Sequence, residues 1–313
     1  MPHTEIVGQS GNQTLGEDMG QELAWGRDYL MVAPDHFRVE YAINPFMDLS
    51  SQPDPVTTRE QWDAIAAGIS AAGGSVEVLD QRADSPDMVY AMNLGLPFQG
   101  GPEGRTAVLS HMRYAERRNE TETAEQWFRG HGFAPVTIGA QGVGAHFEAG
   151  DAFAWRGDLV VGFGPRTERL ALKHLAEELD VRVQGIEINH PGMYHLDLSF
   201  CPLDSERAIV CPAAFPEASA RQLLDLVPEA LVITEDEALS TFCANSIVLG
   251  RTILMPACPD RVRAQLEAWD FEVVLIGVEE FVKGGGAIRC LTNPLDVTLG
   301  RDLVTGVAEV VTA

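Results

Sequence analysis

The sequence predicts an α/β protein made of five similar units arranged around a central axis. Helical patterns alternate with short β-rich runs along the whole chain. The order strand, strand, helix, strand returns roughly every 50–60 residues, a period typical of repeat architectures. Five such units fill the chain and leave no obvious linker between them. We therefore expect one domain with pseudo-fivefold symmetry.

Four helical stretches, each followed by a β-rich run, carry this pattern. Apolar residues recur in them at helical spacing, and Gly or Pro residues mark several of their ends. Helices are predicted over residues 58–72, 121–130, 166–179 and 259–269, and the strands that follow them over residues 75–79, 134–138, 181–188 and 272–276.

One or two strand-like runs precede the helix of each unit. These runs are YLMVAPDHFRV, VYAMNLGL with TAVLSHM, AFAW with DLVVGFG, YHLDLSF with AIVCPA, and SIVLG with TILMP. Polar residues lie in or near the first run of the units: Asn44, Asn93, Asp151, Asp197 and Asn245. In a ring these side chains would converge at the axis, and a concave centre with convergent polar groups is the usual place for an active site. Each residue could equally cap a turn.

The chain ends and the cysteines suggest a cytoplasmic protein. We expect residues 1–29 to be a peripheral segment and residues 30–313 to be the single domain. The N-terminus has no basic region followed by an apolar run, so we expect no signal peptide. No stretch of about 18 apolar residues predicts a membrane span. The five cysteines include no C-x-x-C pair, which argues against a disulfide framework or a zinc site.

The charge of the chain limits its partners. The 313 residues carry a formal net charge of −24, and such a surface repels phosphate backbones and anionic lipids. We therefore expect neither nucleic acid nor membrane as a partner. The acidity is typical of a salt-tolerant surface, and steering of a cationic substrate is a second interpretation.

Cys290 is the candidate nucleophile. It follows three glycines in K-G-G-G-A-I-R-C, which let the backbone approach a ligand closely. Arg289 and Lys283 lie nearby in the sequence, and positive charge lowers the pKa of a thiol and favours the nucleophilic thiolate. The alternative is a buried structural cysteine, which is how we interpret the other four cysteines.

His195 is the candidate acid/base partner. It stands two residues before Asp197 in H-L-D. On a strand these two side chains would share a face, and a carboxylate beside an imidazole can orient it and raise its pKa. A lone histidine in a strand is more often structural, but the pairing with Asp197 favours a functional one.

Glu148 and Asp151 flank Gly150 in a predicted turn. They could bind a cation, take part in acid/base chemistry or form a solvated turn. The sequence contains no pattern that predicts a metal site. G-F-G-P-R-T lacks the third glycine of a dinucleotide fingerprint, and K-G-G-G lacks the order of a phosphate-binding loop. We therefore expect no cofactor.

Seven segments together resemble a known superfamily. They are MVAPDHFRVEYAINPFM, SPDMVYAMNLGL, SHMRYAERRNET, FEAGDAF, GFGPRTE, YHLDLSF and GGGAIRCLT. Over residues 30–295 the chain resembles the guanidino-group-modifying, or pentein, superfamily, which has a five-bladed αβ-propeller fold. Its members include dimethylarginine dimethylaminohydrolase, arginine deiminase, arginine dihydrolases and amidinotransferases. The resemblance implies a cofactor-free enzyme that acts on a small guanidino compound, and a homo-oligomer is its candidate assembly.

The resemblance also implies roles for residues. Cys290 matches the thiolate that attacks the guanidinium carbon, and His195 matches the histidine that protonates the departing amine and then activates water. Glu148 matches the carboxylate that holds the guanidinium. Polar or charged substrate contacts are implied at Asp87, Asn93, Asp197, Arg113 and Arg166. The two arginines match those that grip the amino-acid carboxylate, a task that bidentate pairing suits.

Asn93 is a departure from part of the family. Dimethylarginine hydrolases and arginine deiminases have a second carboxylate there, whereas Asn resembles the arginine dihydrolases, which convert arginine to ornithine, carbon dioxide and ammonia. An amide can donate and accept hydrogen bonds, so it could retain a citrulline-like intermediate for a second attack. We therefore expect an arginine dihydrolase. The alternatives are dimethylarginine dimethylaminohydrolase or arginine deiminase, then an amidinotransferase, and, in a different class, a noncatalytic arginine-binding protein.

Overall fold

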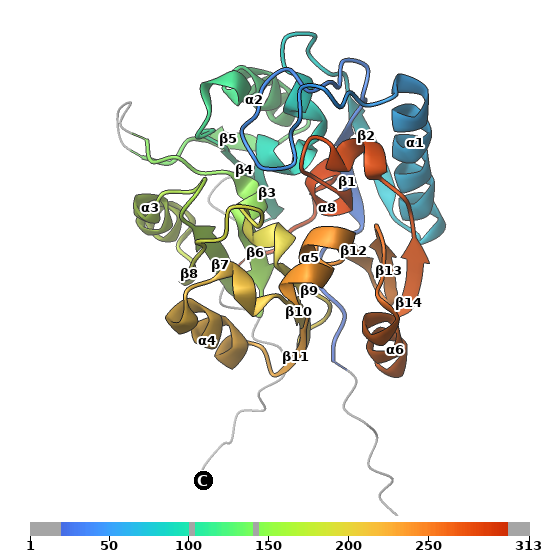
Figure 1. The fold of residues 1–313 in the computed structure, drawn as a ribbon. Helices are drawn as coiled ribbons and strands as arrows, with labels where there is room; N and C mark the ends of the chain where they lie inside the picture. The colour runs from blue at the N-terminus through green and yellow to red at the C-terminus, as the bar shows by residue number, and fades with distance from the viewer. Residues whose placement is uncertain (1–19, 100–103, 140–143, 300–313) are drawn as a thin grey trace, which may run out of the picture.

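The computed structural model describes residues 20–99, 104–139 and 144–299, whose strands form five sheets of three strands each (Figure 1). The strand orders are β15-β1-β2, β3-β4-β5, β6-β7-β8, β11-β10-β9 and β12-β13-β14. In every sheet the middle strand pairs antiparallel with one neighbour and parallel with the other. The same pattern of pairing is thus repeated along the chain.

The strands are short. Their bounds are β1 Asp28–Val32, β2 Ser75–Leu79, β3 Gly95–Gln99, β4 Arg105–Leu109, β5 Ala134–Val136, β6 Ala152–Trp155, β7 Asp158–Phe163, β8 Val183–Glu187, β9 Phe200–Pro202, β10 Arg207–Val210, β11 Glu229–Val232, β12 Ile247–Leu249, β13 Thr252–Met255, β14 Glu272–Leu275 and β15 Asn293–Pro294.

A helix connects the two parallel strands of each sheet. These helices are α1 Pro55–Ala71, α2 Glu120–Gly130, α3 Arg169–Leu179, α4 Glu217–Leu226 and α6 Asp260–Ala268. In Figure 1 they lie at the periphery, and the strands lie closer to the centre. Three shorter helices are α5 Glu235–Thr241, α7 Glu279–Val282 and α8 Ile288–Leu291. The helices predicted from sequence correspond to α1, α2, α3 and α6 with ends shifted by a few residues.

Local sequence explains how α1 begins and which face it buries. Asp54 caps the helix by accepting a hydrogen bond from the backbone N–H of Thr57, and Pro55 occupies the first turn, where a missing N–H costs nothing. Trp62, Ile65 and Ile69 recur at helical spacing and are buried. The apolar stripe therefore fixes the orientation of the helix on its sheet.

The first sheet takes its third strand from the other end of the chain. β15 pairs antiparallel with β1, with Leu30 opposite Asn293. The backbone N–H of Leu295 donates to Asp28 O at 2.7 Å. Because β15 follows α8 almost directly, this pairing also fixes the segment that carries Cys290. The sequence pattern offered only one strand-like run before α1 and did not reveal this pairing.

Two runs predicted as strands are partly 3₁₀ helices. VYAMNLGL contributes to η1 (Pro86–Val89) and η2 (Ala91–Leu94) before β3 begins, and YHLDLSF contains η5 (Leu196–Leu198) before β9. The prediction that His195 and Asp197 share the face of a strand is therefore wrong. The chain turns there because the backbone N–H of Leu198 bonds to His195 O and that of Ser199 to Leu196 O.

Residues 1–19 of the expected peripheral segment lie outside the described residues. Its remaining part includes Trp25, which is buried and donates from Nε1 to Ala154 O at 2.9 Å. No helix in the described ranges is long and apolar enough to cross a membrane.

Candidate active site

Cys290 lies on the short helix α8, and its side chain is buried. Asn245 Nδ2 donates to Cys290 Sγ at 3.2 Å, and Asp197 Oδ2 lies 3.5 Å from the same sulfur. Asn245 Oδ1 in turn accepts from the backbone N–H groups of Ala287 and Cys290. One side chain thus fixes both the backbone around the cysteine and its sulfur.

The glycines before Cys290 allow close packing around the site. A Cβ on Gly286 would lie 2.5 Å from the ring of Tyr90, and Gly285 has a φ of +91°, which other residues rarely adopt. The carbonyl of Gly285 accepts from the hydroxyl of Tyr194 at 2.6 Å. Close approach and positive φ both require glycine here.

The electrostatics of Cys290 differ from the sequence expectation. Burial raises the pKa of the thiol well above its usual value, and the neighbouring Asp197 raises it further. Lys283 pairs with Glu280 at 2.7 Å instead of with the thiol. The Arg289 guanidinium is buried over the rings of Phe153 and Trp25. Burial and Asp197 thus favour the neutral thiol of Cys290 over its thiolate.

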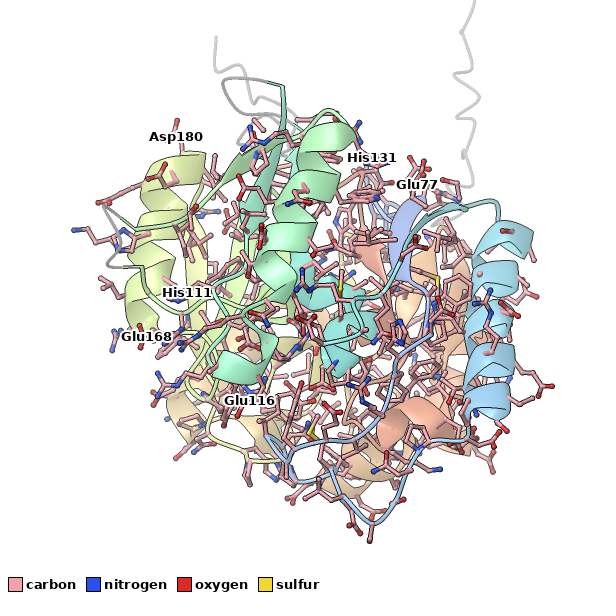
Figure 2. The ribbon with its side chains drawn as sticks, turned by 90° about the horizontal axis from the view of Figure 1, so that it is seen from above. Glu77, His111, Glu116, His131, Glu168 and Asp180 are labelled. Atoms are coloured by element: carbon pink, nitrogen blue, oxygen red, sulfur yellow. The ribbon has the colours of Figure 1, made fainter. Side chains whose placement is uncertain are left out.

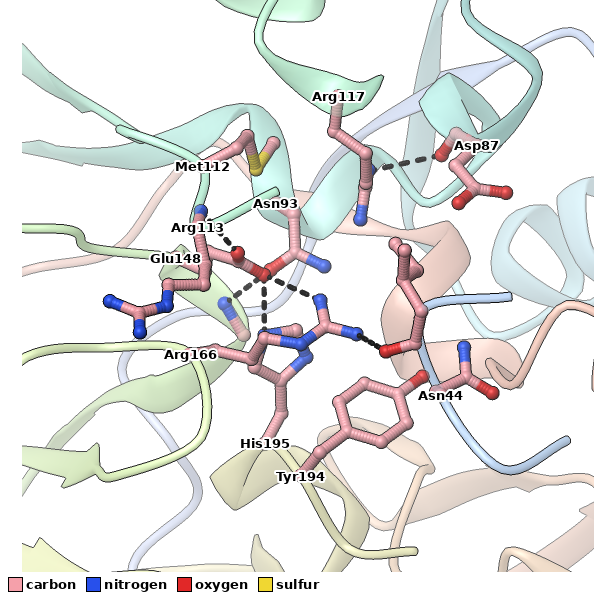
Figure 3. A network of polar contacts seen from close by, with 12 residues as sticks. Asn44, Asp87, Asn93, Met112, Arg113, Arg117, Glu148, Arg166, Tyr194 and His195 are labelled. Carbon is pink, nitrogen blue, oxygen red and sulfur yellow. Dashed lines mark hydrogen bonds and ion pairs between the residues drawn. The ribbon is translucent and has the colours of Figure 1, made fainter. Parts of the chain in front are cut away.

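His195 pairs with Glu148. Its Nε2 lies 2.8 Å from Glu148 Oε2, and both side chains are buried (Figure 3). Burial alone would raise the pKa of Glu148, but Arg166 and His195 outweigh it and lower that pKa. Glu148 is therefore ionised. It is the carboxylate that orients the imidazole, a task the sequence had suggested for Asp197.

Asn93 and Asp197 meet at Gly150. A Cβ on Gly150 would lie 2.9 Å from Asn93 Oδ1 and 3.2 Å from Asp197 Oδ2. The backbone N–H of Gly150 donates to Asn93 Oδ1 at 3.0 Å, so the amide NH₂ of Asn93 remains for the cavity. Burial raises the pKa of Asp197 to about 7. Asp151 instead supports the backbone, because its Oδ1 accepts from Leu196 N.

The two arginines predicted to bind the substrate carboxylate differ in burial and in their partners. Arg166 is buried between the rings of Tyr114 and Tyr194, with Nη1 at 3.1 Å from Glu148 Oε2 and Nη2 donating to Ile43 O. The side chain of Arg113 is half-exposed and pairs with Glu168 at 3.2 Å. Glu168 lies toward the outer edge of the molecule in Figure 2. Only the backbone of Arg113 reaches Glu148, where its N–H donates to Oε1 at 2.9 Å.

Arg117 lines the cavity, although the sequence pattern did not indicate it as a site residue. Its guanidinium forms a bidentate pair with Glu120 and donates to Asp87 O. Burial raises the pKa of Asp87 to about 6. The i, i+3 spacing of Arg117 and Glu120 is the signal that could have revealed their pair, but only the fold brings Arg117 to the cavity. The sequence pattern placed Asn245 among the polar residues that converge at the axis, but it did not predict the contact of Asn245 with the Cys290 thiol.

These groups surround a narrow cavity, and Figure 3 shows the polar contacts among several of them. It is lined by Ile43, Asn44, Met47, Asp87, Tyr90, Asn93, Arg117, Arg166, Tyr194, His195, Gly284, Gly286 and Cys290. Glu148 and Asp197 lie directly behind this lining, through their contacts to His195, Arg166 and Cys290. In the described part of the chain, no group of three or more His, Cys, Asp or Glu could hold a metal ion.

A thiol, an imidazole–carboxylate pair and further acidic groups converge on this cavity. A family model described as N,N dimethylarginine dimethylhydrolase, eukaryotic, matches residues 34–297, and the chain belongs to this family. The chain is therefore a guanidino-group hydrolase, an enzyme that cleaves C–N bonds other than peptide bonds.

Individual relatives include two kinds of enzyme. The chain is 32% identical to an N(G),N(G)-dimethylarginine dimethylaminohydrolase of Mycobacterium tuberculosis, over 85% of each protein. It is 31% identical to the bifunctional arginine dihydrolase/ornithine cyclodeaminase ArgZ of Synechocystis sp., over 84% of this chain and 37% of that protein. The chain thus spans little more than a third of ArgZ.

Solved structures of the N-terminal domain of ArgZ are similar as well. One contains bound substrate, and one is of a variant covalently bonded to a reaction intermediate. Each has a TM-score of 0.80 and 29% identity, over 87% of this chain and 99% of that domain.

Proposed function

We propose that the protein is an arginine dihydrolase that converts arginine and two waters to ornithine, carbon dioxide and two ammonia. The observation that carries this proposal is the orientation of Asn93. Its Oδ1 accepts the N–H of Gly150, so the group left for a ligand is the donor NH₂. A donor suits the carbonyl oxygen of a urea better than it suits a guanidinium, which has only N–H groups to offer.

The first half of the reaction would use Cys290 and His195. The thiol gives its proton to His195 as the cationic substrate enters, and the sulfur attacks the guanidinium carbon. His195 gives a proton to the first ammonia as it leaves. Water, deprotonated by His195, then attacks the carbon and expels the sulfur, which leaves citrulline. Glu148 keeps the imidazole in position and stabilises its charge.

The second half would repeat these steps on citrulline. Asn93 Nδ2 donates to the ureido oxygen and holds the intermediate in the cavity. Cys290 attacks the ureido carbon, and a second ammonia leaves with a proton from His195. Water then releases a carbamate of ornithine, which loses carbon dioxide. An Asp at residue 93 would bring a negative charge against that oxygen and favour release of citrulline.

The amino-acid end of the substrate would lie toward the charged residues of the cavity. Arg166 and Arg113 are the candidates to bind its carboxylate, and Arg117 is a third that only the fold reveals. Asp87 is the candidate for its ammonium group. Asp197, beside the sulfur, and Glu148, which the resemblance assigns to the guanidinium, would contact the guanidinium nitrogens.

The comparisons support both the reaction and its covalent course. ArgZ is named an arginine dihydrolase, and a variant of its N-terminal domain holds a covalently bonded reaction intermediate. The similarity to a dimethylarginine dimethylaminohydrolase keeps that enzyme as the second candidate. Its substrate differs from arginine only by methyl groups on a terminal guanidino nitrogen.

The test is incubation of the protein with arginine and identification of the products by mass spectrometry. Two ammonia per ornithine, with little free citrulline, would support the proposal. Stoichiometric citrulline would indicate a deiminase, and dimethylamine from dimethylarginine would indicate the second candidate. Transfer of the amidino group to added glycine or lysine would indicate an amidinotransferase. Arginine binding without turnover would indicate a noncatalytic binding protein.

We also propose that the five sheets are the blades of one closed αβ-propeller with pseudo-fivefold symmetry, formed by residues 30–313. The repeated pairing pattern and the β15–β1 pairing support it. A cytoplasmic location, the exclusion of nucleic acid and membrane partners, and assembly as a homo-oligomer stay predictions from the sequence.

A further inference from the structure

The carboxylate of Glu148 is already bound to a guanidinium of the protein itself. Glu148 Oε2 accepts from Arg166 Nη1 at 3.1 Å and pairs with His195 Nε2 at 2.8 Å, while Oε1 accepts from the backbone N–H of Arg113 at 2.9 Å. Figure 3 shows the guanidinium of Arg166 beside Glu148, Asn93 and His195, with a dashed line joining it to the carboxylate. The group expected to hold the substrate guanidinium therefore has a guanidinium in place.

Several contacts hold Arg166 there. The guanidinium carbon lies 4.8 Å from the ring centre of Tyr114 and 4.5 Å from that of Tyr194. Nη2 donates to the carbonyl of Ile43 at 3.0 Å. The side chain is 3% exposed and that of Glu148 is 1% exposed. This pair is therefore part of the packed interior of the site and is not a loose surface contact.

A substrate guanidinium and Arg166 compete for the same carboxylate. A guanidinium binds a carboxylate best through two parallel hydrogen bonds to both oxygens. Here Oε2 already has two partners and Oε1 has one. A second guanidinium brought beside the first would also add like-charge repulsion in a buried place. Productive binding at Glu148 thus requires Arg166 to leave it.

We infer that Arg166 is a stand-in for the substrate guanidinium, and that the carboxylate of the substrate must draw Arg166 away before the guanidinium can bind Glu148. This inference rests on the proposed function and names the feature that the substrate must have. An amino acid with a guanidino side chain brings both charges: its carboxylate pairs with Arg166 and its guanidinium takes the vacated place.

Guanidines without a carboxylate cannot make this exchange. They would displace Arg166 into a buried position with no anionic partner, and a buried charge that loses its partner is strongly destabilised. Arg166 therefore selects amino-acid substrates twice, by attracting the carboxylate and by obstructing ligands that lack one. A residue that only gripped the carboxylate would have the first effect alone.

The two roles are separable by binding measurements in the Cys290→Ser protein, which removes turnover. Calorimetry would give the affinities for arginine, N,N-dimethylarginine, agmatine and methylguanidine, the last two having no carboxylate. Arg166→Gln should weaken both amino acids about tenfold or more, and should tighten agmatine and methylguanidine by about tenfold, since a charged hydrogen bond no longer has to be broken.

Arg118→Gln is the matched control. It removes a positive charge whose guanidinium bonds to the backbone carbonyls of Met112 and Arg113 and does not touch Glu148, so it reports the general electrostatic gain for a cationic ligand. Arg166→Lys keeps the positive charge and loses the planar guanidinium group, so it should raise the affinity for agmatine and retain part of the affinity for arginine. Circular dichroism and thermal melting would report whether Arg166→Gln folds. If it does not fold, Arg166→Lys takes its place in the test.

Agmatine and methylguanidine affinities that stay unchanged in both Arg166 variants, or rise no more than in Arg118→Gln, would overturn the inference. Failure of the proposed function has a different signature. If neither amino acid binds the Cys290→Ser protein, the assigned substrate class is wrong. If only dimethylarginine binds, the exchange is tested on that ligand.

Discussion

Asn245 Nδ2 lies 3.2 Å from Cys290 Sγ, and the Oδ1 atom of the same side chain accepts the backbone N–H of Cys290. Among the contacts of the sulfur, this donor lowers the pKa of the thiol, whereas burial and Asp197 raise it. Asn245 therefore both places the thiol and favours the thiolate.

Asn245→Ala should slow alkylation of Cys290 by iodoacetamide at pH 8, because the thiolate loses a hydrogen-bond donor. We expect the half-maximal pH of alkylation to rise. Asn293→Ala is the control, since Asn293 is a buried amide that donates to Ala91 O and Gly95 O without touching the sulfur. An equal effect of both substitutions would mean that Asn245 acts only through stability.

Cys290→Ser should abolish turnover and leave the fold intact, because a hydroxyl is a far weaker nucleophile than a thiolate near neutral pH. Cys201→Ser is the comparison. Cys201 is buried, and burial raises its pKa to about 12, so its replacement should change the chemistry little. Ammonia release and circular dichroism measure both points. Activity retained in Cys290→Ser would exclude the covalent mechanism.

Asn93→Asp should shift the products toward citrulline. The carboxylate would still accept the N–H of Gly150, but it would present a negative oxygen instead of an NH₂ to the ureido intermediate. The measurement is the ratio of ammonia to ornithine, with direct incubation of citrulline as a second assay. Equal citrulline hydrolysis by the native and Asn93→Asp proteins would contradict the role of Asn93.

Asp197→Asn should raise the melting temperature more at pH 8 than at pH 4.5. Burial raises the pKa of Asp197 to about 7 in the folded protein, against about 4 in an unfolded chain. The stability contributed by this carboxyl is therefore complete below about pH 4 and is lost as the pH rises to about 7. Asn has no proton to lose, so we expect a gain of at least about 2 °C at pH 8.

Asp84→Asn is the control for this pH dependence. Asp84 is exposed, and its hydrogen bond to Arg82 lowers its pKa, so its replacement should give no such gain at pH 8. A gain in Asp197→Asn that is the same at both pH values would show that the effect comes from packing and not from ionisation.

Much of the secondary structure was predictable because it depends on local patterns. The apolar spacing of α1 and the β-rich run of β2 are readable within a few residues of chain. The 3₁₀ helices η2 and η5 were not readable as such. Their residues have strand-like composition, and they turn because buried backbone groups bond locally at the edge of the cavity.

The sequence by itself determined the α/β class and the repeated units, because hydrophobic periodicity is local. It also indicated the residues of the site, because the segments around Cys290, His195 and Glu148 resemble those of a known superfamily. Only the tertiary structure decided the partners. It paired His195 with Glu148 instead of Asp197, turned the side chain of Arg113 outward and brought Arg117 to the cavity. Contacts between residues far apart in the chain depend on sheet pairings such as β15 with β1, which no local pattern encodes.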